Sequence, residues 1–232
     1  ALARRLGASL PESSESSGKG VSERCHPVLD SRSLTLTAIR LDCANVLDFQ
    51  FMRELRLLAE EVKPDFWLMG EVIHGEYGRW VNSEMLHSVT NYEMHKSIYS
   101  AHNDHNYFEL AHNVRRLQAI GRSLYTFLDN HDEDRIASKL KDPNHLKVIY
   151  TLLYTLPGIP SVYYGSEWGI EAGAPIPATT PSGPEFCLLK PESRKTLSFP
   201  PTSSVWGNTE NLPALHGGAY EELLLTNRQY AF

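Results

Sequence analysis

The amino-acid sequence predicts an α/β protein that is built from parallel βα units. In residues 34–171, short apolar segments alternate with longer segments whose apolar residues recur at helical spacing. Strands that are separated by helices at this spacing generally pair in parallel. The 232-residue chain is 41% hydrophobic and 22% charged, a composition typical of a soluble protein with an apolar core.

Three strands and one helix are predicted in the first part of this zone. Residues 34–42 and 65–72 predict strands, and four consecutive apolar residues in the second are typical of a strand that is covered on both faces. Residues 45–63 predict a helix that ends at Lys63-Pro64, and residues 86–93 predict a weaker strand. The apolar face of the helix would consist of Met52, Leu55, Ala59 and Val62.

The second part of the zone repeats the alternation. Residues 107–121 predict a helix and residues 124–128 a strand. Residues 145–156 then predict a second helix, and residues 159–165 a strand that begins after a proline-glycine pair. The whole zone is therefore expected to contribute about five strands.

Segments of different composition lie on both sides of this zone. Residues 1–33 contain eight serines and predict a disordered lead. Residues 172–206 are rich in proline, serine and threonine and predict an irregular segment. Residues 207–232 regain strand-like character after two successive glycines.

Composition also excludes some classes of function. The formal net charge of −6 argues against a nucleic-acid partner, which would require a basic surface. No apolar stretch is long enough to predict a membrane span, and no secretion signal is visible, so we expect a cytoplasmic protein. Three cysteines are too few for a disulfide framework, and Cys43 is predicted to be a small core residue.

Charged residues follow several of the predicted strands. Asp42 is the last residue of the first predicted strand, Glu71 lies near the end of the second, and Asp129 to Asp132 follow the strand at residues 124–128. Because active sites of parallel βα folds collect at the carboxyl ends of the strands, these acids are expected to converge. A turn made by Asp and Asn is the plainer interpretation of any single one of them.

Converging carboxylates suit the cleavage of glycosidic bonds. One carboxylate attacks the anomeric carbon, and a second, protonated carboxyl group gives its proton to the leaving oxygen. The positive charge of Arg40 would keep Asp42 ionised for the first role. The apolar residues before Glu71 would favour its protonated form for the second role, and Asp132 could stabilise positive charge on the sugar ring.

Four segments then resemble the α-amylase superfamily of glycoside hydrolases, and within it the cyclomaltodextrinase, neopullulanase and maltogenic amylase group. The segment "IRLDCAN" is similar to the segment with the nucleophile, "LMGEVIH" to that with the acid/base, and "FLDNHD" to that with the third acid. The segment "GIPSVYYGSEWG" is similar to the signature of the eighth strand. The order of the four segments is that of the family.

The resemblance implies a role for each of these positions. Asp42 would be the nucleophile, Glu71 the general acid/base and Asp132 the transition-state stabiliser. The substrate-binding residues would be Arg40, Asn45 and His131. The implied partner is an α-glucan oligosaccharide, such as a maltodextrin, a cyclodextrin or a starch-like glucan. Ala38 and Val46 differ from the residues usual in the family, which would alter substrate contacts but not the acids.

The resemblance also implies a (β/α)8 barrel, of which residues 34–171 would supply about strands 4 to 8. Residues 207–232 resemble the start of a C-terminal β-domain. The first conserved segment of the family has no counterpart here. No cofactor is expected, because calcium is possible in the family but its usual ligand segment is missing. Open barrel edges with exposed Leu34 and Leu36 would favour self-association. The alternative to a hydrolase is an inactive, amylase-like chain that binds oligosaccharides.

Histidine and aromatic clusters have plain structural interpretations. His102, His105 and His112 are predicted to be surface histidines rather than metal ligands. Stacking on sugar rings is considered for three aromatic residues near the last strand, although packing is at least as good an interpretation: Tyr163, Tyr164 and Trp168. Tyr77 and Trp80 are two further candidates to line a sugar subsite.

Overall fold

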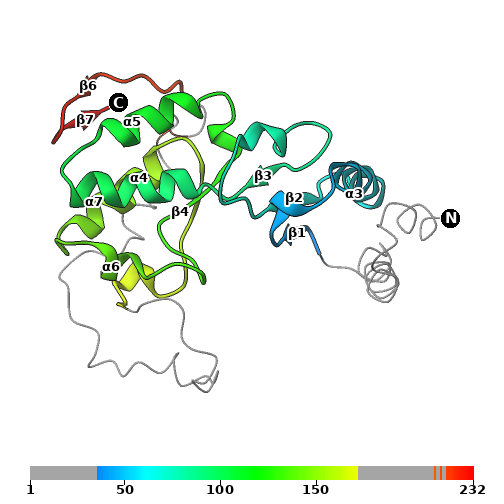
Figure 1. Cartoon of the computed structure of the whole chain (residues 1–232), viewed down its shortest axis with the longest axis horizontal. Helices are drawn as coiled ribbons and strands as arrows, with labels where there is room; N and C mark the ends of the chain where they lie inside the picture. Colours follow the sequence, from blue (N-terminus) through cyan, green and yellow to red (C-terminus); the bar gives the residue numbers. More distant parts are fainter. Residues whose placement is uncertain (1–35, 172–211, 213–214, 216–217) are drawn as a thin grey trace, which may run out of the picture. The chain divides into compact units, whose positions relative to one another are not determined.

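The computed structural model describes residues 36–171, 212, 215 and 218–232, and strands alternate with helices in most of them (Figure 1). The strands are β1 (Ala38–Leu41), β2 (Trp67–Gly70), β3 (Ser88–Val89), β4 (Tyr125–Phe127), β5 (Ile159–Ser161), β6 (Leu224–Leu225) and β7 (Tyr230–Ala231). The α-helices are α3 (Phe49–Val62), α4 (Tyr92–Asn103), α5 (Phe108–Arg116), α6 (Ile136–Lys139) and α7 (His145–Thr155). Short 3₁₀ helices are η2 (Ala44–Val46), η3 (Tyr77–Arg79), η4 (Gly121–Ser123) and η5 (Ser166–Trp168). The predicted lead and proline-rich segment lie outside the described residues.

Strands β1, β2 and β3 form one parallel sheet and strands β4 and β5 form another, which confirms the predicted parallel pairing. Strand β1 pairs with β2 so that Leu41 lies opposite Gly70, and β2 pairs with β3. Strand β4 pairs with β5 through Tyr125 and Ile159. Because the paired strands run in the same direction, the residues that follow β1 and β2 leave the sheet at one edge.

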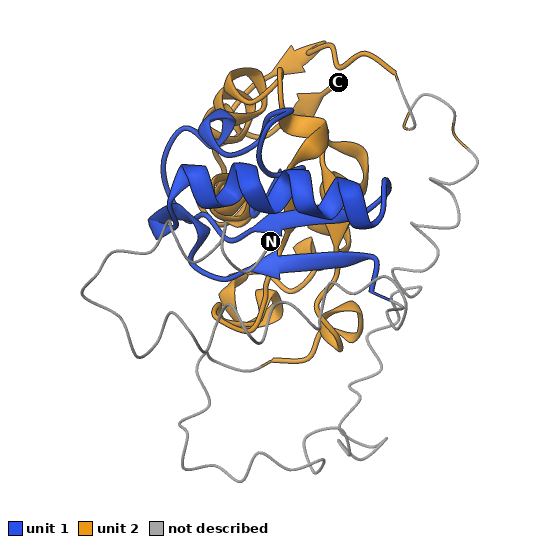
Figure 2. Ribbon diagram, turned by 90° about the vertical axis from the view of Figure 1, so that its right-hand side faces the viewer, with its two compact units in different colours: residues 1–90 blue, residues 91–232 orange. Residues whose placement is uncertain are grey.

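The chain divides into two compact units, residues 1–90 and residues 91–232 (Figure 2). In the first unit, α3 lies alongside β1 and β2 (Figure 2). Asp48 begins this helix, because its carboxylate accepts a hydrogen bond of 3.0 Å from the Phe51 amide. The buried helix face consists of Met52, Leu55, Leu58 and Ala59, so Leu58 contributes where Val62 was predicted and Val62 is half-buried.

The strand β2 is covered on both faces, as its run of apolar residues predicts. Leu68 and Met69 point to opposite sides of the sheet, and both are buried. Trp67, at the beginning of the strand, is half-buried. The buried strand is followed directly by Glu71, which is buried as well.

The second unit has a core between helices α4, α5 and α7. Met94 and Ile98 from α4, Leu110 from α5 and Ile149 from α7 are among its buried residues. Tyr230 packs against this core from β7, which pairs antiparallel with β6. The sequence predicted strand-like character in this tail, and the structure shows two short strands.

Helix α4 was not predicted, and it replaces most of the strand expected at residues 86–93. Only Ser88–Val89 form a strand there. Asn91 then begins the helix, because its side-chain oxygen accepts a hydrogen bond of 3.1 Å from the Met94 amide. The buried face of α4 includes Ser97 and His102, and such polar residues hide the apolar periodicity that normally reveals a helix.

Other elements are shorter than predicted. The strand expected at residues 159–165 ends at Ser161, after which the chain turns with a positive φ of 85° at Gly165. The helix expected at residues 107–121 ends at Arg116. None of the helices in the described ranges combines the length and the apolar character needed to cross a lipid bilayer.

A methyl group at Gly70 should destabilise the first unit. The Cβ atom of an alanine there would lie 2.5 Å from Leu86 Cδ1 and 2.7 Å from Ala44 Cβ, both of which are buried. We expect Gly70→Ala to lower the free energy of unfolding by about 1–3 kcal/mol, as overpacking of a core does. Denaturant unfolding followed by circular dichroism measures this change.

Gly78→Ala is the matched control, because nothing lies within 4 Å of a Cβ atom at Gly78. An exposed substitution of this kind should change the free energy of unfolding by less than about 0.5 kcal/mol. Equal effects of the two substitutions would contradict the close approach at Gly70.

Candidate active site

Asp42 and Glu71 lie side by side at the ends of β1 and β2. A carboxylate oxygen of each, together with Cys43 Sγ, lies within 4.8 Å of the others. The register explains this proximity, because Asp42 and Glu71 directly follow the paired residues Leu41 and Gly70. The two acids that the sequence places after separate strands are thus brought together.

Arg40 joins the two acids. Its Nη1 atom donates to Asp42 Oδ1 at 2.9 Å, and its Nη2 atom lies 3.1 Å from Glu71 Oε2. Arg40 and Asp42 are two residues apart and therefore point to the same side of the strand. The predicted contact with Asp42 is confirmed, and the contact with Glu71 is an addition that the sequence did not suggest.

The two acids differ in their surroundings. The side chain of Asp42 is 72% exposed, whereas that of Glu71 is 8% exposed. The backbone amide of Cys43 donates a hydrogen bond of 3.1 Å to Glu71 Oε2. The Glu71 backbone is fixed as well, because its amide donates to Leu41 and its carbonyl accepts from Ala44, each at 2.8 Å.

The electrostatic environment favours the charged form of Asp42. A hydrogen bond with Glu71 and the nearby Arg40 guanidinium hold the pKa of Asp42 below its ordinary value. The negative charge of Asp42 in turn raises the pKa of the Cys43 thiol. Asp42 is therefore held in its ionised form, as a carboxylate that attacks directly must be.

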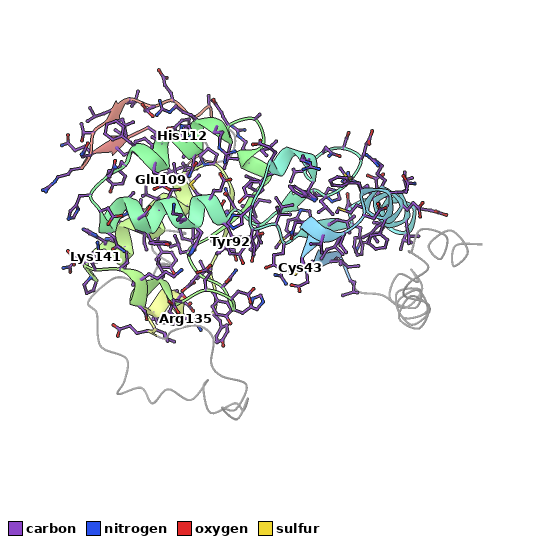
Figure 3. The ribbon with its side chains drawn as sticks, viewed as in Figure 1. Cys43, Tyr92, Glu109, His112, Arg135 and Lys141 are labelled. Atoms are coloured by element: carbon purple, nitrogen blue, oxygen red, sulfur yellow. The ribbon has the colours of Figure 1, made fainter. Side chains whose placement is uncertain are left out.

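The prediction that Cys43 is a core residue was wrong. Its side chain, which Figure 3 labels, is exposed. Its backbone has a left-handed conformation with φ 46° at the start of η2. Asn45 lies within η2 and is also exposed, as a residue that contacts substrate must be. The turn at Cys43 thus presents Cys43 and Asn45 to solvent, whereas Ala44 between them is buried.

His131 and Asp132 belong to the second unit, in the loop between β4 and α6. Their side chains are 55% and 49% exposed, and His131 Nε2 lies 3.1 Å from Asp132 Oδ2. Asn130 shapes this turn, because its side-chain oxygen accepts a hydrogen bond of 2.9 Å from the Asp132 amide. Asp129 is buried, so of the four polar residues after β4 only His131 and Asp132 are exposed. Their convergence with Asp42 and Glu71 stays a prediction.

Three of the aromatic and histidine candidates, Tyr77, Trp80 and His102, are buried. Tyr77 and Trp80 are 1% and 5% exposed, so the prediction that they line a sugar subsite is wrong. His102 was predicted at the surface but is buried, and its ring nitrogens lie 2.9 Å from the Ile98 carbonyl and 3.0 Å from the Tyr107 hydroxyl. His105 and His112 are exposed, as predicted.

The three aromatic residues after β5 differ in their exposure. Tyr164 and Trp168 are 59% and 57% exposed, so packing in the core does not account for them. Tyr163 is half-buried and lies under the Arg135 guanidinium, 4.3 Å from its ring centroid. Stacking on sugar rings stays open for Tyr164 and Trp168.

One group of three potential metal ligands comes together in the described part of the chain, namely Asp42, Cys43 and Glu71. Arg40 lies against both carboxylates and already balances part of their charge. A cation at this place would be repelled by the guanidinium at close range. The guanidinium therefore makes this group of three a poor site for a metal ion.

Replacement of Arg40 should raise the pKa of Asp42. In Arg40→Gln the guanidinium is lost, so the pKa should move up toward its ordinary value of 3.8. A carboxylate with a lowered pKa stabilises the fold above the ordinary value, and this contribution is lost as the pH falls through the lowered pKa. NMR titration of the Asp42 carboxyl carbon measures the shift.

Arg53→Gln is the control for this measurement, because Arg53 pairs with Glu84 and is not among the causes of the Asp42 shift. Arg53→Gln should leave the pKa of Asp42 unchanged. An unchanged Asp42 pKa in Arg40→Gln would show that the guanidinium does not control this carboxylate.

Comparison with known proteins identifies the family. The family described as alpha amylase, catalytic domain, matches residues 37–195. Maltogenic alpha-amylase of Bacillus acidopullulyticus is 28% identical over 150 residues, which cover 61% of this chain and 25% of that protein. Neopullulanase 2 of Thermoactinomyces vulgaris is 32% identical over 149 residues, with coverage of 60% and 25%. The chain thus spans about a quarter of the length of these relatives.

Solved structures agree with this match. The ligand-free cyclic alpha-maltosyl-(1→6)-maltose hydrolase from Arthrobacter globiformis has a TM-score of 0.72 at 20% identity, and covers 89% of this chain and 48% of its own. An alpha-amylase from Anoxybacillus has a TM-score of 0.66 at 25% identity, with coverage of 84% and 44%. The fold of this family is a (β/α)8 barrel, and the described part represents a portion of one. The chain therefore belongs to the alpha-amylase family, with residues 37–195 in the catalytic domain.

Proposed function

We propose that this chain carries the catalytic acids of a retaining glycoside hydrolase that cleaves α-glucosidic bonds in maltodextrins, cyclodextrins or starch-like glucans. The observation that carries the proposal is the close pair of Asp42 and Glu71, in which one carboxylate oxygen of each lies within 4.8 Å of the other. Retaining enzymes keep their two carboxyl groups about 5–5.5 Å apart, whereas inverting enzymes leave room for a water molecule at about 6.5–9.5 Å. The close spacing supports direct attack by one carboxylate.

In the first step, Asp42 attacks the anomeric carbon while Glu71 gives its proton to the leaving oxygen. A bond forms between Asp42 and the sugar, and the glucosidic bond breaks. Arg40 and the Cys43 amide both contact Glu71 Oε2, so Oε1 is the oxygen that can carry the transferred proton. In the second step, Glu71 takes a proton from water, which attacks the same carbon and releases Asp42.

The remaining residues of the site would bind the sugar. Asp132 would stabilise the positive charge that develops on the ring, and His131 beside it would hold a sugar hydroxyl group. Asn45, on the exposed turn after Asp42, would contact a neighbouring sugar. This assignment requires the loop after β4 to face the same substrate as β1 and β2.

The names of the relatives support the substrate class. They include a maltogenic alpha-amylase and a cyclomaltodextrinase, which is 27% identical over 150 residues. Another relative, from Bacillus subtilis, is described as an intracellular maltogenic amylase. We therefore propose an α-glucan oligosaccharide as the partner and the cytoplasm as the location.

Glu71→Gln should separate protonation from the other parts of catalysis. Because glutamine cannot donate the proton, kcat on a maltodextrin should fall by about 10²–10⁴-fold. An aryl α-maltoside with a good leaving group needs little protonation, so its cleavage should fall much less. Steady-state kinetics on the two substrates measures the difference.

Asp42→Asn should abolish cleavage of both substrates, because it removes the nucleophile. Glu84→Gln is the control, since Glu84 is an exposed acid that pairs with Arg53. Equal losses on both substrates in Glu71→Gln would contradict the role of Glu71. Oligosaccharide binding without any turnover by the unmodified protein would favour the alternative of an inactive binding protein.

A further inference from the structure

The loop that carries His131 and Asp132 is fixed at both ends by one hydroxyl group. Ser166, in η5 after β5, is 1% exposed. Its Oγ atom donates a hydrogen bond of 2.7 Å to Asp129 Oδ2, at the beginning of the loop. The same atom accepts a hydrogen bond of 2.8 Å from Arg135 Nη1, at the end of the loop. A single buried side chain therefore connects the two ends of residues 129–135.

Each end of the loop has further contacts that fix its direction. Asp129 Oδ2 also accepts a hydrogen bond of 2.8 Å from the Ile136 amide, at the first residue of α6. Arg135 Nη1 donates to the Tyr164 carbonyl at 2.6 Å, and its guanidinium lies 4.3 Å from the Tyr163 ring centroid. Arg135, labelled in Figure 3, is 6% exposed, so these contacts must offset the cost of burying its charge.

The middle of the loop is held from helix α4. Asn130 donates a hydrogen bond of 3.0 Å to the Tyr92 hydroxyl. Glu133 pairs with Lys139, whose ammonium group lies 3.2 Å from His95 Nε2. These contacts leave His131 and Asp132 as the exposed tip of an anchored loop.

We propose that Ser166 is a positioning residue, which fixes both ends of the loop and so places Asp132 and His131 for catalysis. This inference rests on the role that the proposed function gives to Asp132. The hydroxyl is suited to the task because it donates to an acid and accepts from a guanidinium at once. Ser166 itself does not contact the sugar in this proposal, and it acts through the loop.

The first experiment measures the anchoring without any substrate. Ser166→Ala removes the connection, so hydrogen exchange at the Ile136 amide, followed by NMR, should become at least about tenfold faster. Amides in α5 and α7 should keep their rates. Ser88→Ala is the matched control, because Ser88 is also buried but its hydroxyl has no hydrogen-bond partner among the described residues. Unchanged exchange at Ile136 in Ser166→Ala overturns the proposal.

The second experiment connects the anchoring to Asp132. On an aryl α-maltoside, Ser166→Ala should lower kcat by about 10- to 100-fold, as a displaced catalytic group does, with KM within about twofold. In the Asp132→Asn background the same substitution should have almost no effect, because residues that act through one group are not additive. Ser166→Thr keeps the hydroxyl group and should restore most of kcat.

If Ser166→Ala lowers kcat by the same factor with Asp132 intact and in Asp132→Asn, Ser166 acts on the fold in general. That result overturns the positioning role. A normal kcat in Asp132→Asn would instead contradict the proposed function of Asp132, while the exchange at Ile136 still decides whether Ser166 anchors the loop. If Ser166→Ala does not fold, Ser166→Cys replaces it in both experiments, since a thiol occupies nearly the same place but is only a weak hydrogen-bond donor and acceptor.

Discussion

The parallel register of β1 and β2 is the constraint on which the pair of acids depends. Leu41 lies opposite Gly70, and backbone hydrogen bonds continue past the strand ends from Glu71 to Leu41 and from Ala44 to Glu71. A slip of one residue would turn Arg40 to the other face of the sheet, away from Glu71. The missing Cβ atom of Gly70 lets Ala44 and Leu86 approach closely, so packing and register support each other.

Within that register, the surroundings distinguish two residues of the same chemistry. Asp42 is open to solvent, whereas Glu71 directly follows the strand β2 and is buried. Its Oε2 atom contacts Arg40 and accepts a hydrogen bond from the Cys43 amide. A pair of carboxylates in unlike environments can divide the tasks of nucleophile and proton donor. Arg40 is well suited to hold such a pair, because its planar fork reaches both acids from one side.

The sequence was sufficient for the parallel βα alternation and for the placement of Asp42 and Glu71 at the ends of two strands, because strand periodicity and local motifs carry that information. The contact of Arg40 with Glu71 crosses from one strand to the other, so no local motif could indicate it. The sequence was insufficient for α4, whose inner face mixes polar residues such as His95 and Ser97 with the apolar ones. The exposure of Cys43 results from a left-handed backbone conformation that no local sequence pattern predicted. Ser166 meets Asp129 across 37 residues of sequence, and contacts of that separation are decided by tertiary packing.

The anchored loop has a consequence for the entropy of binding. Holding one residue of a flexible chain in a single backbone conformation costs about 1–2 kcal/mol of conformational entropy. In the loop after β4, Asp129, Asn130, Glu133 and Arg135 are already held by the fold, so the backbone that carries the exposed tip has little freedom left to lose. A ligand that meets His131 and Asp132 would therefore find them ordered beforehand, and more of its contact energy would remain as affinity.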